Sequence, residues 1–233
     1  MKTPTEIIQT AIGEGRKALL EHEAKELARA VGIAVPRYEL VDAHDKQALF
    51  MAAKRLGFPL ALKAVSPEVL HKTDAGAVAL DIANYEELVE AADSMKKRVS
   101  ERVPGAMIRY FLLEEMMAPG LELLIGGLRD VQFGPAVAFG LGGIWVEALK
   151  DTAFGILPMT DRETLDMMAG TKAGKFLKGF RGSAPLDEKS AISIIKAVSQ
   201  LMTGFTEIQE IDLNPVRVYP AGAVALDVRV ILR

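Results

Sequence analysis

The sequence predicts a mixed α/β (α+β) fold whose second half is rich in strands. Helical and strand-like segments alternate in the first part of the chain. From Pro104-Gly105 to Val146, short apolar segments alternate with turns that contain Gly and Pro. The chain then closes with two alternating segments around a tight turn, a pattern typical of an antiparallel hairpin. A fully parallel, doubly wound sheet does not fit this second half.

The N-terminal part contains helices separated by strands. Up to about Gly15 the pattern is weak and indicates an extension or a short helix. Apolar residues then recur at helical spacing over 14–31, and Gly32 lies where a helix should end. The elements expected next, in order, are an extended segment 33–41, a helix capped by Asp42 and ended by Gly57, strands 58–65 and 77–82, and a helix from Asn84 to about Arg102.

The C-terminal part contains two further helices and the closing hairpin. The helices are predicted near 161–169 and 187–202. The hairpin strands are predicted at 206–218 and 222–232, joined by the turn at Tyr219-Pro220-Ala221-Gly222.

The composition is that of an ordinary globular protein. The 233 residues include 28 basic and 31 acidic ones, a net charge of −3, so nothing points to nucleic acid or an anionic membrane. No apolar run is long enough to span a membrane, and the N-terminus lacks the apolar core of a signal peptide. Cysteine is absent, which excludes disulfides and thiolate sites. We therefore expect a soluble, cytoplasmic protein.

The closing hairpin carries a candidate metal site. Because side chains alternate between the faces of a strand, Asp212 and Asn214 share one face of the first strand. In the second strand, Leu226 and the valines at alternating positions must face the core, so Asp227 and Arg229 point the other way. If the strands pair, Asp212, Asn214 and Asp227 converge as oxygen ligands suited to Mg²⁺. The alternative is a solvated face with a salt bridge to Arg229.

A lysine and the loop after it form a second candidate site. Lys63 is the only charge in strand 58–65 and is not expected to be fully buried without a partner. It could hold nucleotide phosphates or be an ordinary edge-strand lysine. The following loop brings His71, Thr73 and Gly76 into one turn whose amides could bind an anion. His71 could be a base, a metal ligand, a phosphoryl acceptor or a surface residue.

Other features of the chain do not match known nucleotide motifs. Residues 140–145 begin like the dinucleotide fingerprint, but Trp145 replaces the third glycine. Residues 170–176 look like a P-loop, but the glycines are one residue too close and Phe176 replaces Ser or Thr. Any phosphate binding must therefore be of another kind. The remaining histidines, His22 and His44, are expected to face solvent.

Several segments share an order and spacing that is specific when taken together. They are Leu62–Pro67, His71–Gly76, Glu122–Gly126, Arg129–Pro135, Phe139–Gly143, Ile211–Pro215 and Ala225–Arg229. From about Glu21 to the C-terminus, the chain resembles the beta (ATP-grasp) subunit of ADP-forming acetyl-CoA synthetases. These belong to the NDP-forming acyl-CoA synthetase family, which is related to succinyl-CoA synthetase.

The resemblance implies an ATP-grasp fold of two subdomains that clasp a nucleotide. It divides the chain into an extension (1–20), an N-terminal subdomain (21–112) and a C-terminal subdomain (113–233). It also implies the reversible reaction acyl-CoA + ADP + phosphate = acid + ATP + CoA, with ATP/ADP and Mg²⁺ as cofactors. In that reaction a phosphoryl group passes from a histidine of a partner alpha chain to a second histidine, which matches His71, and then to ADP.

The resemblance assigns roles only to matched positions. Asn214 and Asp227 match the Mg²⁺ ligands, and Asp212 would orient or stabilise the phosphohistidine. Positions that would contact the nucleotide or its phosphates are Lys63, Thr73, Gly76, Glu114, Glu115, Met116, Glu122 and Arg229. Gly76-Ala77 stands where many relatives carry two glycines, and Arg129-Asp130 receives no role.

The resemblance also implies a partner. An alpha subunit would carry the CoA-binding and acyl-CoA-cleaving domains, in an α2β2 heterotetramer. Two alternatives remain: a succinyl-CoA-synthetase-like ligase subunit with another acyl preference, and a nucleotide-binding regulatory subunit without turnover. The joint presence of His71, Lys63, Asn214 and Asp227 argues against the regulatory alternative.

Overall fold

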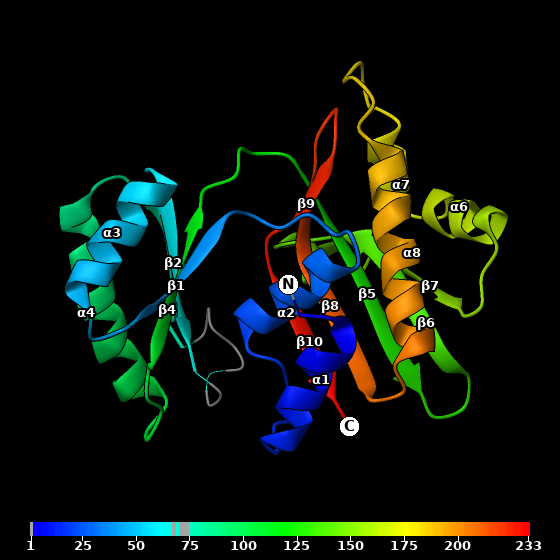
Figure 1. Ribbon diagram of the computed structural model, residues 1–233. Coiled ribbons are helices and arrows are strands. Elements are labelled where there is room, and N and C mark those ends of the chain that lie inside the picture. Colours follow the sequence, from blue (N-terminus) through cyan, green and yellow to red (C-terminus); the bar gives the residue numbers. More distant parts are fainter. Residues whose placement is uncertain (1, 67–68, 70–74) are drawn as a thin grey trace. The chain divides into compact units, whose positions relative to one another are not determined.

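The computed structural model of the chain describes residues 2–66, 69 and 75–233. His71 and Thr73 therefore lie outside the described residues. The chain forms two compact units (Figure 1): a smaller unit, Pro36–Ala118, and a larger unit made of Met1–Val35 and Pro119–Arg233. Both units are mixed α/β with antiparallel sheets, which confirms the predicted fold class.

The smaller unit is a four-stranded sheet covered on one side by two helices (Figure 1). Helices α3 (Lys46–Leu56) and α4 (Tyr85–Arg102) bury their apolar faces against core side chains such as Leu62 and Phe111. Because side chains alternate along a strand, Lys63 and Glu114 belong to the opposite face. The strand order is β1-β4-β2-β3, with bounds β1 (Tyr38–Asp42), β2 (Leu60–Val65), β3 (Val78–Ile82) and β4 (Tyr110–Glu115).

Local capping explains where the helices of the smaller unit begin. Asn84 accepts a hydrogen bond from the Glu87 amide at 3.0 Å, so the predicted start of α4 is confirmed. The predicted cap Asp42 is wrong: its carboxylate accepts from the His44 amide, and the residue ends β1. Asp45 caps α3 instead, accepting from the Ala48 amide at 2.8 Å.

The larger unit is built on a six-stranded antiparallel sheet. Its strand order is β10-β8-β5-β6-β7, and the short strand β9 also pairs with β8. The predicted C-terminal hairpin is confirmed, with its second arm divided between β9 and β10. The bounds are β5 (Leu121–Asp130), β6 (Gly134–Leu141), β7 (Thr152–Ile156), β8 (Ile208–Val218), β9 (Ala223–Ala225) and β10 (Val228–Leu232).

Helices cover one face of this sheet and share one core. Residues of α1 (Pro4–Gly13), α2 (Glu21–Ala30), α7 (Lys172–Leu177) and α8 (Glu188–Gly204) all contribute to it. Helix α8 passes close over β5, because a Cβ added at Gly127 would lie 2.5 Å from a Met202 side-chain carbon. The predicted helix 161–169 is confirmed as α6 (Asp161–Ala169), whereas α5 (Trp145–Leu149) and α7 were not predicted.

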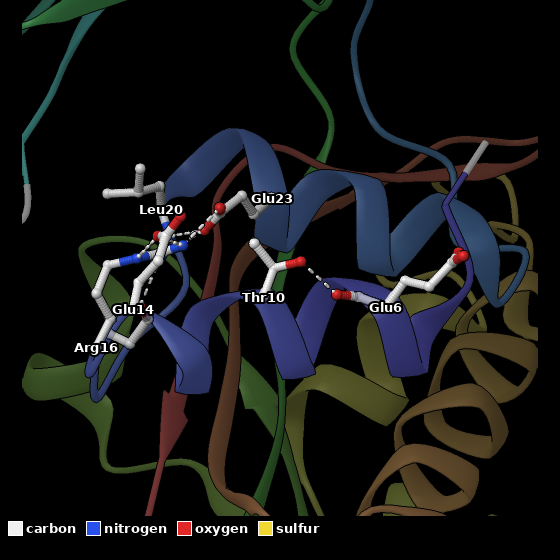
Figure 2. Close-up of polar contacts among 7 residues, drawn as sticks. Glu6, Thr10, Glu14, Arg16, Leu20 and Glu23 are labelled. Atoms are coloured by element: carbon white, nitrogen blue, oxygen red, sulfur yellow. Dashed lines mark hydrogen bonds and ion pairs between the residues drawn. The ribbon is translucent and has the colours of Figure 1, made fainter.

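Helix α2 begins at Glu21 rather than at residue 14, because the preceding segment is extended along β10. The Leu19 amide donates to the Val230 carbonyl, and the Leu232 amide donates to the Lys17 carbonyl. Figure 2 shows how the turn before α2 is fixed: the Arg16 guanidinium donates to both carboxylate oxygens of Glu23, at 2.6 and 2.8 Å. Glu23 also accepts from the Leu20 amide at 2.8 Å, so one carboxylate holds the start of the helix.

The compact units do not coincide with the predicted divisions at 20/21 and 112/113. Residues 1–35 pack with the C-terminal part of the chain, because 17–19 pair with β10 and α1 and α2 join its core. Residues 113–118 stay with the smaller unit, since β4 continues to Glu115. No helix among the described residues has the length and apolar character needed to cross a membrane.

Candidate functional site

Strands β8 and β10 bring charged side chains together on the sheet face opposite the helices. Arg229 pairs directly with Asp212 in the ladder. Its guanidinium donates to Glu210 Oε1 at 2.6 Å and lies 3.6 Å from Asp212 Oδ2. The salt bridge to Arg229, which was the alternative to a metal site, is therefore present, and Glu210 is the nearer partner of Arg229.

Asn214 and Asp227 lie opposite each other in the same hairpin. The ladder pairs Leu213 with Val228 on one side and Val216 with Ala225 on the other. The same register, continued through the interval, sets Asn214 across from Asp227. Such directly opposed residues bring their side chains within about 5.5 Å at Cβ. The register therefore sets Asp227 across from the part of β8 that carries Asp212 and Asn214.

The burial predicted for the last strand is wrong for residues 223–226. Ala223 and Ala225 are buried, whereas Val224 and Leu226, which were expected to face the core, are only half-buried. After Leu226, Val228 and Val230 are buried as expected. The phase of burial changes because the strand is interrupted between β9 and β10. Simple alternation across residues 222–232 could not reveal this break.

The environment of Asp212 favours its protonated form. Burial raises the pKa of this carboxyl, and the negative charges of Glu210 and Asp227 raise it further. Arg229 acts in the opposite direction without cancelling the effect. Among these charged side chains, three carboxylates stand against the single guanidinium of Arg229.

Asn214 also organises the glycine-rich turn that follows β6. Its side-chain Oδ1 accepts a hydrogen bond from the Gly143 amide at 2.8 Å. Gly143 has φ +59°, and a Cβ there would lie 2.1 Å from Glu122 Oε2. The turn therefore needs glycine in order to lie directly against Glu122.

Glu122 is held by an arginine that sequence reasoning missed. The guanidinium of Arg217 donates from Nε and Nη2 to Glu122 Oε1, at 3.0 and 2.9 Å. The two residues face each other in the β5–β8 ladder. Arg217 could be identified only from the pairing register of β5 and β8, because no motif in its local sequence indicates a role.

The smaller unit holds a buried ion pair between Lys63 and Glu114. Lys63 Nζ lies 3.0 Å from Glu114 Oε2, and the two side chains are only 9% and 4% exposed. The expectation that Lys63 needs a partner is therefore confirmed. The pair forms a diagonal contact across β2 and β4, in which Lys63 faces Leu112 and Glu114 faces Ala61.

The residues after Glu114 are tied to the start of β1. The Glu115 carboxylate accepts from the amide and the Nε of Arg37, at 2.8 and 2.7 Å. The Met116 amide donates to the Pro59 carbonyl at 3.2 Å. The Glu115 side chain is therefore already engaged in local structure, whereas the half-buried Met116 is held through its backbone.

Gly76, at the end of the loop that contains His71, is hydrogen-bonded to helix α4. Arg98 Nε donates to the Gly76 carbonyl at 3.2 Å, and Gly76 has φ +67°, which favours glycine. Ala77 is fully buried, and its carbonyl accepts from the Ala64 amide. Alanine is therefore accommodated at this position as part of the β2–β3 connection.

The remaining expectations concern isolated residues. His44 is exposed, as predicted, but His22 is half-buried and desolvation lowers its pKa. Arg129 donates to the Met202, Phe205 and Ile208 carbonyls at and after the end of α8, and Asp130 accepts from the Gln132 and Phe133 amides. These last two residues have structural roles in the positions described.

The donor set of the hairpin suits a hard cation better than a structural transition metal. Within the described ranges, no group of at least three His, Cys, Asp or Glu side chains is placed to hold a metal. Asn214 and Asp227 offer one amide and one carboxylate oxygen, and Mg²⁺ needs only one or two carboxylates beside water and phosphate oxygens. An amide oxygen has a second lone pair besides the one used by Gly143.

Comparison with known proteins agrees with these features over nearly the whole chain. A family model described as an ATP-grasp domain matches residues 10–232. The beta subunit of acetate–CoA ligase [ADP-forming] II from Pyrococcus furiosus is 40% identical over 97% of both chains.

Solved structures extend the comparison to three dimensions. Acetyl-coenzyme A synthetase 1 from Ca. Korarchaeum cryptofilum, in complex with coenzyme A, Ca-AMPCP and HgCl⁺, has a TM-score of 0.93 and 39% identity. The match covers 99% of this chain and 100% of that one. Another structure of that enzyme contains coenzyme A and Mg-AMPPCP, with its phosphohistidine segment pointing towards the nucleotide-binding site. It has a TM-score of 0.83 and 37% identity over the same shares of the two chains.

Proposed function

The chain belongs to the ATP-grasp family, among the beta subunits of ADP-forming acetate–CoA ligases, and we propose that it transfers a phosphoryl group between His71 and Mg-bound ADP. The complete reaction is acyl-CoA + ADP + phosphate = acid + ATP + CoA. The observation that carries the proposal is the β8–β10 register, which sets Asn214 opposite Asp227 with Asp212 close by.

Lys63 is proposed to bind nucleotide phosphate. Its ammonium group is nearly buried and lies 3.0 Å from Glu114 Oε2. A phosphate oxygen beside this ammonium would replace part of that interaction and gain strength from the low exposure. Further proposed nucleotide contacts are Thr73, Gly76, Glu114, Glu115, Met116 and Glu122.

Asn214 and Asp227 are proposed to hold Mg²⁺. Bound there, the ion would neutralise the charge that phosphoryl transfer concentrates on phosphate oxygens. Asp212 would hold the imidazole of His71 in its reactive orientation, since a part-buried carboxylate is a strong acceptor for an imidazole N–H. Arg229, fixed by Glu210, would add a positive charge to the same face.

His71 is proposed to carry the phosphoryl group. In ATP formation the bond between phosphorus and the imidazole nitrogen breaks, and its electron pair returns to nitrogen. A new bond forms between phosphorus and the terminal phosphate oxygen of ADP. Histidine suits this exchange because its neutral nitrogen is nucleophilic near neutral pH and a good leaving group in reverse.

The proposed partner is an alpha subunit that binds CoA and cleaves acyl-CoA. The relative from Pyrococcus furiosus is named as a beta subunit, which supports a second chain. An α2β2 heterotetramer is the proposed assembly and the cytoplasm its proposed location. Acyl preference would then be set by the partner and not by this chain.

The test is ATP formation by this chain with its alpha partner, acyl-CoA, phosphate and Mg-ADP. His71→Ala should abolish ATP formation and leave ADP affinity within about twofold, because the side chain acts in transfer and not in binding. His44→Ala is the matched control, since His44 is exposed on a turn of the smaller unit. Full activity of His71→Ala would overturn the relay.

The same assay separates the alternatives. A succinyl-CoA-synthetase-like subunit would form ATP only with succinyl-CoA in a panel of acyl-CoA substrates. A regulatory subunit would bind Mg-ADP but support no ATP formation with any of them. Formation of ATP with acetyl-CoA supports the proposed function over both.

A further inference from the structure

Helix α2 buries a lysine that the proposed reaction does not use. Lys25 is 0% exposed and is among the largest fully buried side chains of the chain. Glu21, one turn earlier, is 4% exposed, and the two charges lie 3.6 Å apart. Burying an ion pair costs more than it returns unless further hydrogen bonds satisfy the charges. The hydrogen bonds of the Lys25 ammonium group therefore indicate what the burial of this ion pair achieves.

Lys25 supplies a hydrogen bond that the hairpin lacks. The Leu226 amide donates to the Pro215 carbonyl at 2.9 Å. The reciprocal bond of an antiparallel pair cannot form, because proline has no N–H. Lys25 Nζ donates to the Leu226 carbonyl at 2.7 Å and takes the place of that missing donor.

The residue fixed in this way is next to Asp227. The strand is interrupted between β9 and β10, so residues 226–227 lie between the two strand segments of this arm. The two residues across from them are Pro215 and Asn214. A bond to the Leu226 carbonyl therefore restrains the peptide group that leads directly into Asp227.

Both ends of α2 are attached to the same arm of the hairpin. The Ala225 amide donates to the Ala34 carbonyl after the helix, and 17–19 pair with β10 before it. Helix α2 is therefore attached to this arm both before and after Lys25, which donates to the residue at the interruption between β9 and β10.

We propose that Lys25, neutralised by Glu21, is a positioning residue for Asp227. Its ammonium group holds the 226–227 peptide so that the Asp227 carboxylate stays opposite Asn214. This inference rests on the proposed function, in which Asp227 binds the divalent cation. In this proposal Lys25 acts through the backbone and is not itself a ligand of the nucleotide or the cation.

The test measures cation binding by the full chain, with Mn²⁺ as a spectroscopic substitute for Mg²⁺. Free Mn²⁺ is followed by electron paramagnetic resonance during titration at saturating ADP. Lys25→Met alone would leave Glu21 buried without its cation, so the variant is E21Q/K25M. We expect Mn²⁺ affinity to fall about 10-fold, as when a group behind a metal ligand is removed. Affinity for ADP without metal should not change.

Two further variants separate positioning from general destabilisation. Glu21→Gln keeps the Lys25 donor and should bind Mn²⁺ like the parent chain, with a lower melting temperature because the buried ammonium group loses its counter-ion. Arg16→Met breaks the Glu23 contact on the same helix without touching Leu226, and should lower the melting temperature but not Mn²⁺ affinity. If E21Q/K25M does not fold, E21Q/K25Q is used, which also removes both charges and shortens the side chain that donates to the Leu226 carbonyl.

The outcomes distinguish this inference from the proposed function. Asp227→Ala should abolish ADP-dependent Mn²⁺ binding, and unchanged binding there would remove the proposed metal site itself. If Asp227→Ala loses Mn²⁺ while E21Q/K25M binds it normally, the metal site stands and the positioning role is refuted. An equal loss in Glu21→Gln and E21Q/K25M would also refute it, because only the latter lacks the bond to Leu226.

Discussion

At the scale of single residues, Asp212 has opposite effects on stability and on the proposed function. Its ionised form lowers stability, whereas the proposed reaction uses its carboxylate. It is part-buried on β8, with Glu210 and Asp227 nearby and Arg229 opposite. Because its pKa is raised in the folded chain, the folded state binds a proton more readily than the unfolded state. Ionisation of Asp212 at neutral pH therefore lowers the free energy of unfolding.

Asp212→Asn should accordingly stabilise the free chain at pH 7 and abolish ATP formation with the alpha partner. The gain should be complete above the raised pKa of Asp212 and should disappear as pH falls towards about 3.9, the unfolded value. Urea unfolding of both chains between pH 7 and pH 4 measures it. Greater stability of the parent chain at pH 7 would show that the attraction of Arg229 outweighs burial.

Asp130→Asn is a control for which the expected change in stability at pH 7 has the opposite sign. Hydrogen bonds from the Phe133 and Gln132 amides lower the pKa of Asp130. Its charge therefore stabilises the folded chain above the unfolded pKa, and this contribution is lost as pH falls through the folded value. Asp130→Asn should be less stable than the parent chain at pH 7, and the difference should shrink in acid.

A lone charge in an apolar strand predicted that Lys63 needs a partner, and that partner is Glu114. The face on which Asp227 lies could not be derived from simple alternation over residues 222–232, because the burial phase changes between β9 and β10. Arg217 and Lys25 could not be found in this way. Each acts on a residue far away in the sequence, Glu122 and Leu226, and only the tertiary arrangement joins them.

At the scale of elements, helix α8 shows how a sheet residue can complete a helix end. The last carbonyl groups of a helix have no partners within it. Arg129 of β5 donates to three carbonyl groups at and after the end of α8, those of Met202, Phe205 and Ile208. Arg129-Asp130, which the sequence left without a role, therefore joins β5 to α8 and forms the following turn.

Arg129→Ala should lower the free energy of unfolding by about 2 kcal/mol, because hydrogen bonds to a charged donor are lost at a half-buried site. Arg162→Ala is the matched control: its ion pair with Asp166 is exposed, and its loss should cost at most about 0.5 kcal/mol. Denaturant unfolding of both variants checks the difference. Equal effects would show that Arg129 does not stabilise the end of α8.

Elements with strong local signals were predicted well. The capping residues Thr160 and Asn84 lie immediately before α6 and α4, whose starts are as predicted. The start of α2 was placed too early, because helical spacing continues into a segment that β10 draws into an extended conformation. Tertiary pairing overrides local propensity in such segments.

At the scale of the whole molecule, the chain builds its larger unit from both ends of the sequence. It leaves that unit at Pro36, forms the smaller unit, and returns at Pro119. The bond between Leu19 and Val230 joins residues whose local sequences contain no sign of the pairing. For this reason the fold class was predictable from pattern, while the unit boundaries were not.

The central claim is that His71 accepts and donates the phosphoryl group. The most direct measurement is the incubation of this chain with Mg²⁺ and ATP labelled in its γ-phosphate, followed by mapping of acid-labile, base-stable phosphate. The label should be on His71, should be absent in His71→Ala but present in His44→Ala, and should be released by added ADP as ATP. A chain that forms ATP with its alpha partner, yet carries no label on His71 or the same label in His71→Ala, would contradict the account.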